Sequence, residues 1–230
     1  MKFFAYFPIA MLTVGVCSSP VPALEKDAVV ANTIPDVFWP VHLLPEVLAR
    51  VGGRIITYGY NANISSFSDG VSSDHICNHA EALVSSLAAN RSLTNCSDRP
   101  IIFVCHSLGG LVVKRVLNYS KNIQNERMKH IRSTWISTYG ILFLGTPYLA
   151  SDGAKWGVLL QIICSAGVPK KVMDSSSLFS ALTNNETLQN INSLFAEDMG
   201  RYHMYFFYET LETDVRGTLE PIVDESSAAP

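Results

Sequence analysis

Residues 101–114 read Ile-Ile-Phe-Val-Cys-His-Ser-Leu-Gly-Gly-Leu-Val-Val-Lys. The apolar, β-branched residues 101–104 predict a strand, and the apolar spacing after the two glycines predicts a helix. Ser107 stands between them, so the order is strand, tight turn with a serine, helix, which is typical of the nucleophile elbow Gly-x-Ser-x-Gly. Such a turn predicts a strained backbone at Ser107 and a hydroxyl that stands clear at the edge of a sheet.

The elbow departs from Gly-x-Ser-x-Gly at its first glycine, which is Cys105 here. Cysteine is small and packs like an apolar residue, so the turn is crowded but still feasible. The backbone N–H of Leu108, at the start of the helix, is the candidate donor to a developing oxyanion. The alternative interpretation is a glycine-punctuated strand–helix junction with an incidental serine. The remaining elbow residues are His106, Gly109 and Gly110.

The composition indicates one domain. The chain has 230 residues, 48% of them hydrophobic, and a formal net charge of −3. That length supports a single sizeable core, and the weak negative charge gives no electrostatic reason to expect nucleic-acid binding. The Cys and His residues do not have zinc-site spacing, so the sequence predicts neither a metal site nor a cofactor.

The N-terminal segment differs in character from the rest. Lys2 precedes an apolar run over residues 3–16, and small residues follow at 21 and 23. This pattern is typical of a secretory signal peptide over residues 1–23. The alternative is a first core strand, or a segment that lies outside the domain. Localisation depends on this choice: secreted if the signal is genuine, intracellular otherwise.

Apolar strands alternate with helices along the chain, which predicts an α/β fold with a mainly parallel sheet. We expect helices over 39–49 and 74–89, from the elbow to about 119, partly over 126–138, and two or three between 152 and 199. We expect strands over 54–60, 101–105, 139–144, 202–208 and 219–223.

Several motifs in order carry a family resemblance. They are Val-Phe-Trp-Pro at 37–40, Leu-Leu-Pro-Glu-Val-Leu at 43–48, Arg-Ile-Ile-Thr-Tyr-Gly-Tyr at 54–60, the elbow, Gly-Ile-Leu-Phe-Leu-Gly-Thr-Pro at 140–147, and Phe-Tyr-Glu-Thr at 207–210. Together they resemble the serine esterase (lipase-like) domain of the α/β-hydrolase superfamily. The version meant is common at the N-terminus of fungal proteins with NACHT, ankyrin or tetratricopeptide repeats. The resemblance implies an α/β-hydrolase domain over residues 37–230.

The chain departs from this family at three places. No His-Gly loop, which would donate part of the oxyanion hole, precedes Val37. Tyr148-Leu149-Ala150 follows Gly-Thr-Pro, where the family usually has His-Arg-Gly. The catalytic histidine of the family is expected beyond Pro230. We therefore expect a domain truncated at its first strand and at its histidine segment.

The resemblance implies a catalytic order of serine, acid and histidine. Ser107 is the expected nucleophile, Glu209 at the end of a strand is the expected acid, and Asp224 is the alternative acid. The base histidine is not identified. His203 is the least unsuitable of the histidines, which are His42, His75, His79, His106, His130 and His203.

Two functions follow from these residues. The first is a serine hydrolase that cleaves a carboxylic or lipid ester through an acyl-enzyme on Ser107. The second is a catalytically impaired pseudo-hydrolase that serves as a binding or signalling module. The expected partner of the first is an ester or lipid substrate, and a membrane surface stays open as a further partner. The sequence names no protein partner.

Overall fold

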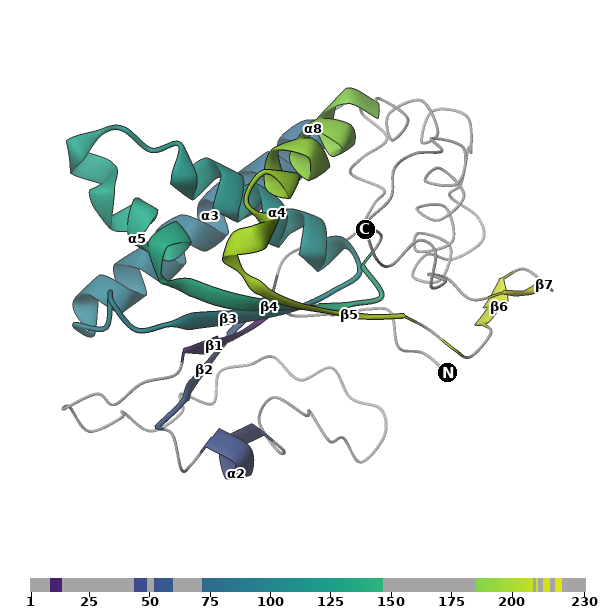
Figure 1. Cartoon of the computed structure of the whole chain (residues 1–230), viewed down its shortest axis with the longest axis horizontal. Helices are drawn as coiled ribbons and strands as arrows, with labels where there is room; N and C mark the ends of the chain where they lie inside the picture. The colour runs from purple at the N-terminus through teal and green to yellow at the C-terminus, as the bar shows by residue number, and fades with distance from the viewer. Residues whose placement is uncertain are drawn as a thin grey trace.

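The computed structural model describes residues 9–13, 44–48, 52–59, 72–146, 185–208, 210, 213–215 and 218–220. Its main feature is a five-stranded sheet with the order β2-β1-β3-β4-β5 (Figure 1). The strands are β1 (Ile9–Thr13), β2 (Arg54–Tyr58), β3 (Ile101–His106), β4 (Thr138–Leu144) and β5 (His203–Phe207). A separate two-stranded antiparallel sheet joins β6 (Thr213–Val215) and β7 (Thr218–Glu220).

The strands β3, β4 and β5 form a parallel group, as the alternation of strands and helices predicts. In their register His106 lies opposite Leu144, and Leu144 lies opposite Phe207. Because the strands run in the same direction, their carboxyl ends meet on one side of the sheet, here called its carboxyl edge, and the turn after β3 lies there. The side on which these strands begin is called the amino edge. This arrangement is a small parallel sheet with helices packed on it, in agreement with an α/β fold.

The strand β1 comes from the segment for which the sequence left two interpretations open. It pairs antiparallel with both β2 and β3, between Ala10 and Val104 on one side and between Met11 and Ile56 on the other. The apolar run therefore has a place in the sheet as a first strand. Cleavage after residue 23 would remove this strand, which lies between β2 and β3. The signal peptide stays a prediction.

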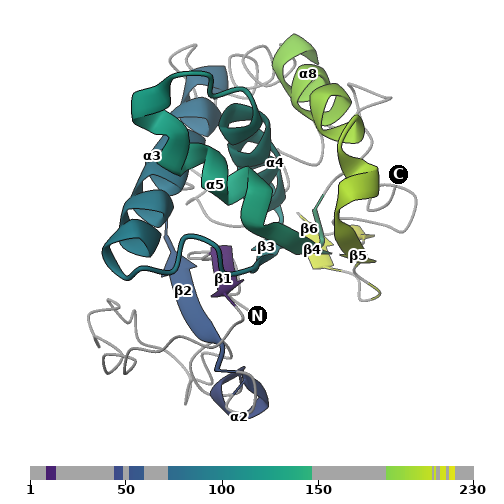
Figure 2. The ribbon, with the colours of Figure 1, turned by 60° about the vertical axis from the view of Figure 1, so that its left-hand side comes forward.

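Four helices lie on one face of the sheet (Figures 1 and 2). They are α3 (Ser72–Leu93), α4 (Leu108–Lys121), α5 (Lys129–Ser137) and α8 (Asn185–Ala196). Shorter elements are α2 (Leu44–Leu48) and the 3-10 helices η2 (Glu126–Met128) and η3 (Met199–Arg201). Among the residues placed by the structure, no helix combines the length and the apolar character that a membrane span needs.

The core lies between these helices and the sheet. The residues expected on the inner face of the second predicted helix are all buried in α3, namely Ile76, Ala80, Leu83, Val84 and Leu87. From β3 the core receives Ile101, Phe103 and Cys105, each fully buried, whereas the alternate residues of this strand are only partly buried. The strand therefore buries one face fully and the other in part, which is less than its continuous apolar sequence predicts.

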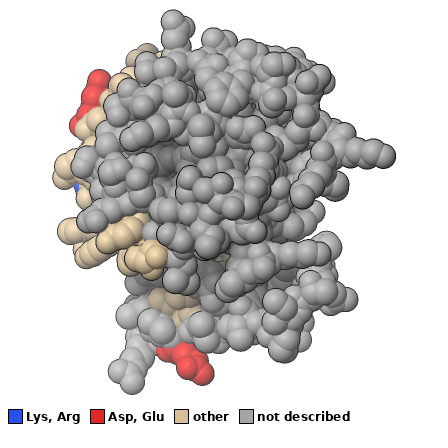
Figure 3. Space-filling model, turned by 90° about the vertical axis from the view of Figure 1, so that its right-hand side faces the viewer, with Lys and Arg blue, Asp and Glu red and all other residues tan. Residues whose placement is uncertain are grey.

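Few charged side chains of the described residues lie on the side of the molecule shown in Figure 3. There, acidic side chains are visible at separate places and Lys or Arg side chains hardly at all. Large apolar side chains are exposed on the edge strand β5 and just after it, at Tyr205, Phe207 and Tyr208.

Candidate active site

Ser107 lies directly between β3 and α4, in the middle of the sheet and at its carboxyl edge. Its backbone has φ 50° and ψ −126°. A positive φ is rare for a residue with a side chain, because Cβ crowds the backbone, and such a conformation costs about 1–3 kcal/mol. The expected strain is thus present in the backbone at the serine that the sequence singles out.

Both backbone polar groups of Ser107 have partners. Its N–H donates to the carbonyl of Leu144 at 3.0 Å, and its carbonyl accepts from the N–H of Gly110 at 3.0 Å. The carbonyl also accepts from the Thr146 hydroxyl at 3.1 Å. The strained turn is therefore tied to the end of β4 at both of its backbone groups.

Thr146 and Gly110 fit closely together beside this turn. Thr146 is 1% exposed. A Cβ added to Gly110 would lie 2.2 Å from Cγ2 and 2.4 Å from Oγ1 of Thr146. No side chain fits at position 110 while Thr146 keeps its place. Thr146 belongs to the Gly-Thr-Pro stretch of the sequence resemblance, but no role is predicted for it from the sequence.

The end of β5 reaches the same edge of the sheet. Gly145, with φ 52°, donates its N–H to the carbonyl of Phe207 at 2.7 Å. Glu209, the expected acid, follows Phe207 by two residues but lies outside the described residues, as does Asp224. The structure therefore brings the backbone of β5 to the Ser107 turn and leaves the choice of acid a prediction.

The described histidines lie at different places on the sheet and helices. His203 begins β5 and lies about 13 Å along the strand from Phe207, at the opposite edge from Ser107. Its ring packs against that of Tyr139 at a tilt of 36°, with ring centroids 4.5 Å apart. His130, on α5, is exposed. His203 is thus not placed to serve Ser107, because a residue that begins a parallel strand lies at the wrong edge.

His106 is the described histidine at the carboxyl edge, immediately before Ser107. It is partly buried, and burial lowers its pKa to about 4. Burial disfavours the charged imidazolium, so His106 is neutral at neutral pH. His106 ends β3 and is the residue next to Ser107 in the chain.

A buried lysine lies behind the turn. Lys114, on α4, is 0% exposed and donates to Oδ1 of Asn192 on α8 at 3.0 Å. Its ammonium group lies 5.2 Å from the centre of the Phe143 ring and 5.6 Å from that of Phe195. Burial lowers the pKa of Lys114 to about 7, and burial raises the pKa of the neighbouring Cys105 thiol. Lys114 stands in the opening sequence motif, but its burial follows only from the helix packing.

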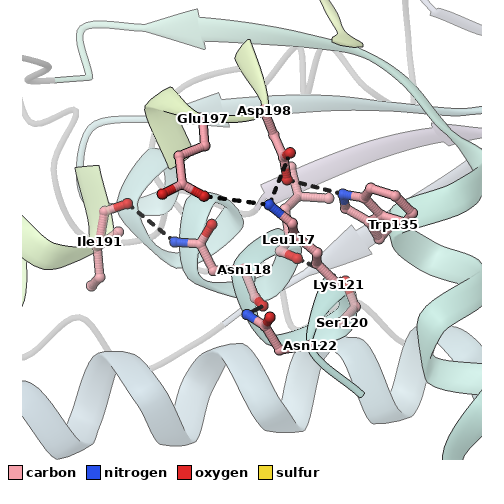
Figure 4. Close-up of polar contacts among 9 residues, drawn as sticks. All are labelled: Leu117, Asn118, Ser120, Lys121, Asn122, Trp135, Ile191, Glu197 and Asp198. Atoms are coloured by element: carbon pink, nitrogen blue, oxygen red, sulfur yellow. Dashed lines mark hydrogen bonds and ion pairs between the residues drawn. The ribbon is translucent and has the colours of Figure 1, made fainter. Parts of the chain in front are cut away.

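The other end of α4 is fixed by polar contacts to α8, to the turn that follows α8 and to α5, shown in Figure 4. Lys121 pairs with Asp198 at 3.0 Å and with Glu197 at 3.6 Å. The indole N–H of Trp135 donates to the second carboxylate oxygen of Asp198 at 3.2 Å, and Asn118 donates to the carbonyl of Ile191 at 3.1 Å (Figure 4). These contacts hold the helix that begins directly after Ser107.

Among the described residues, no group of three or more His, Cys, Asp or Glu side chains is arranged to hold a metal ion. The chemistry available at the described part of the edge is therefore that of a strained serine, two converging backbone turns and a helix N-terminus. The expected oxyanion donor, the Leu108 N–H, stands at that N-terminus.

These features define an α/β protein with a strained serine at a strand–helix turn. Comparison with known proteins finds distant relatives. The chain is 27% identical over 193 residues to Protein SERAC1 of Mus musculus, a match of 83% of the chain and 27% of that relative. It is 30% identical over 116 residues to Protein SERAC1 of Bos taurus, half of the chain and 16% of the relative.

The matched region is about a quarter of the mouse relative's length. No protein-family model and no solved structure matches the chain. The relatives are mammalian proteins, so the fungal multidomain setting of the sequence resemblance stays a prediction.

Proposed function

We propose that the chain is a serine hydrolase that cleaves carboxylic esters through an acyl-enzyme on Ser107. The observation that carries this proposal is the backbone of Ser107, with φ 50° and ψ −126° at the carboxyl end of a central strand. A strained serine persists only where its surroundings hold it, and such strain is concentrated at functional sites. The similarity to the SERAC1 proteins supports a hydrolase-like domain.

The reaction has two halves. Ser107 Oγ attacks the ester carbonyl carbon while a base takes the hydroxyl proton, and the carbonyl oxygen becomes an oxyanion. The Leu108 N–H, at the start of α4, donates to this oxyanion. The alcohol leaves with the proton, and water then attacks the acyl-enzyme to release the acid and free the serine. The proposal requires a histidine base from outside the described residues, with Glu209 or Asp224 as its orienting acid.

The ester is expected to carry an apolar group. Phe207 is 48% exposed and Tyr208 is 45% exposed, and both lie at the carboxyl end of β5, on the edge that carries Ser107. Exposed aromatic side chains bind apolar surface and so favour an ester with an aliphatic acyl chain over a small polar one. A lipid ester is the natural member of that class.

Labelling with a fluorophosphonate probe tests the proposal. The probe phosphonylates an activated serine, and intact mass reads one adduct. We expect an adduct on the wild-type chain and its loss in Ser107→Ala. Ser86→Ala is the matched control, because Ser86 is an exposed serine on α3 away from the turn. This variant keeps the adduct.

The contrary outcome is equally readable. A folded wild-type chain that takes no adduct contradicts the hydrolase proposal and favours the non-catalytic binding module. Folding is checked by a cooperative unfolding transition. An adduct that persists in Ser107→Ala contradicts the assignment of the nucleophile. Rates on p-nitrophenyl esters of rising acyl length then test the apolar substrate.

A further inference from the structure

A buried threonine supports the candidate turn from the neighbouring strand. Thr146 follows β4, is 1% exposed, and donates its hydroxyl to the Ser107 carbonyl at 3.1 Å. We propose that Thr146 is a positioning residue, whose hydroxyl fixes the peptide plane that carries the Leu108 N–H. This inference rests on the proposed function, because it assigns that N–H to an oxyanion.

The geometry of the peptide bond connects the two groups. The Ser107 carbonyl and the Leu108 N–H belong to one peptide unit, which is planar and trans. In a trans peptide the C=O and the N–H point in opposite directions. A donor that holds the Ser107 carbonyl on one side therefore fixes the direction of the Leu108 N–H on the other side. An oxyanion donor acts through direction and distance, so this control matters to rate.

Two donors hold the Ser107 carbonyl, and they come from different elements. The Gly110 N–H, at 3.0 Å, comes from the same helix and moves with it. The Thr146 hydroxyl comes from the end of β4. Only the second donor ties the peptide plane to the sheet. Leu144, which accepts the Ser107 N–H at 3.0 Å, ties the other side of the serine to the same strand.

The place of Thr146 is itself fixed. Its Cγ2 and Oγ1 fill the space above Gly110, where an added Cβ would lie at 2.2 Å and 2.4 Å from them. Gly145, one residue earlier, turns with φ 52° and donates to the carbonyl of Phe207 on β5 at 2.7 Å. Thr146 is therefore held by the Gly145 turn, which is hydrogen-bonded to the end of β5. The expected acid, Glu209, follows β5 in the sequence.

The experiment compares substitutions at Thr146 in the full chain. Thr146→Val keeps the shape and removes the hydroxyl, and Thr146→Ser keeps the hydroxyl. The matched control is Thr138→Val. Thr138 begins the same strand, is 5% exposed and donates its hydroxyl to the Thr134 carbonyl at 2.7 Å, at the other edge of the sheet. Each variant is measured for stability, for its fluorophosphonate labelling rate and for hydrogen exchange of the Gly110 amide.

We expect Thr146→Val to label about tenfold more slowly than wild type, since small displacements of a reacting geometry cost this much or more. Thr146→Ser labels at a rate near that of wild type. Thr138→Val loses comparable stability and labels at the wild-type rate. Equal labelling by Thr146→Val and Thr138→Val would overturn the inference, because removal of either hydroxyl would then act through stability alone.

Two further arms keep the inference testable. If Thr146→Val does not fold, Thr146→Cys replaces it, because a thiol is close in size to the serine hydroxyl but is a weak donor. A cysteine variant that labels like the serine variant then overturns the inference. If the wild-type chain takes no adduct, the proposed function fails, and hydrogen exchange decides about Thr146. Faster exchange at Gly110 in Thr146→Val than in Thr138→Val supports the positioning role, and equal exchange overturns it.

Discussion

The two edges of the sheet are built in different ways. At the carboxyl edge the turns after β3 and β4 use a strained serine, two glycines and a threonine, with φ positive at both Ser107 and Gly145. At the amino edge, the connections that precede β3, β4 and β5 use large charged and aromatic side chains. Positive φ also occurs at the amino edge, at Asn95 and Gly52, but there buried side chains bind the loop carbonyls and close the connections.

The amino edge shows how such contacts close a loop. Arg91, 1% exposed at the end of α3, donates to the carbonyls of Ser97 and Arg99 in the connection to β3, the latter at 2.7 Å. Arg99 in turn donates to the carbonyl of Gly52 at 2.6 Å, just before β2. The contrast is therefore one of contacts: buried side chains stabilise the amino edge, whereas backbone hydrogen bonds and one threonine hydroxyl hold the serine at the carboxyl edge.

The largest effect is expected at the amino edge. Arg91→Met removes a donor to two loop carbonyls. The Ser97 carbonyl keeps the Ser137 hydroxyl as a donor at 2.9 Å, whereas the buried Arg99 carbonyl loses the guanidinium. We expect the free energy of unfolding to fall by about 3–4 kcal/mol, since an unsatisfied buried group costs about 1–3 kcal/mol and a lost hydrogen bond to a charged group about 1.5–3 kcal/mol. Urea unfolding measures this loss.

If stability belongs to the amino edge, the folded Arg91→Met variant keeps its fluorophosphonate labelling rate at low temperature. A labelling rate that falls in parallel with stability would contradict the division between the edges. Arg132→Met, at an exposed position on α5, serves as a control for the loss of a positive charge.

The next effect is a pH dependence at the carboxyl edge. Burial lowers the pKa of His106 to about 4, against 6.5 in the unfolded chain. Between these pH values the unfolded chain binds more protons, so the free energy of unfolding rises with pH over this window. The contribution is complete above about pH 6.5 and is lost as the pH falls toward 4, a loss of about 2–3 kcal/mol.

Unfolding of His106→Gln at a series of pH values measures this contribution. The variant is expected to lose less stability than wild type between pH 7 and pH 4. Gly200→Ala, where no atom lies within 4 Å of the added Cβ, is the control for a substitution without a titratable group and follows the wild-type curve. If both variants follow the wild-type curve, His106 does not carry the dependence.

A third effect tests the close fit of the carboxyl edge. Gly110→Ala places a methyl group on Thr146, within 2.8 Å of three of its atoms. Overpacking a buried site costs about 1–3 kcal/mol, and we expect about 2 kcal/mol here together with slower labelling. Gly200→Ala, where no atom lies within 4 Å of the added Cβ, is the control that keeps both stability and labelling.

The sequence predicts most of the described helices and strands because their periodicity is local. The apolar spacing of α3 places Ile76 to Leu87 inward, and this is confirmed. The strained turn at Ser107 also follows from local order, as strand, serine and helix. The short strand β6 was not predicted, because Thr213–Val215 has neither length nor apolar character.

The side chains that hold the Ser107 turn in place could not be predicted from the sequence, because their contacts join segments that are distant along the chain. Thr146 lies 39 residues from Ser107, and nothing in its own neighbourhood indicates the carbonyl that it binds. Lys114 looks like a surface residue until α8 covers it. The run at residues 9–13 fits both a signal peptide and a buried strand, because short apolar runs lack periodicity that separates the two.

The smallest effect returns to the amino edge. Lys121 is partly exposed and pairs with Asp198 and Glu197, so water and salt screen its attraction. We expect Lys121→Met to lower the melting temperature by no more than about 2 °C, and the difference from wild type to shrink further in 1 M NaCl. Thermal unfolding at low and high salt measures both quantities. If Lys121→Met lowered the melting temperature as much as Arg91→Met, exposed ion pairs would stabilise this edge as strongly as buried hydrogen bonds. Burial would then not determine how much a contact at the amino edge contributes.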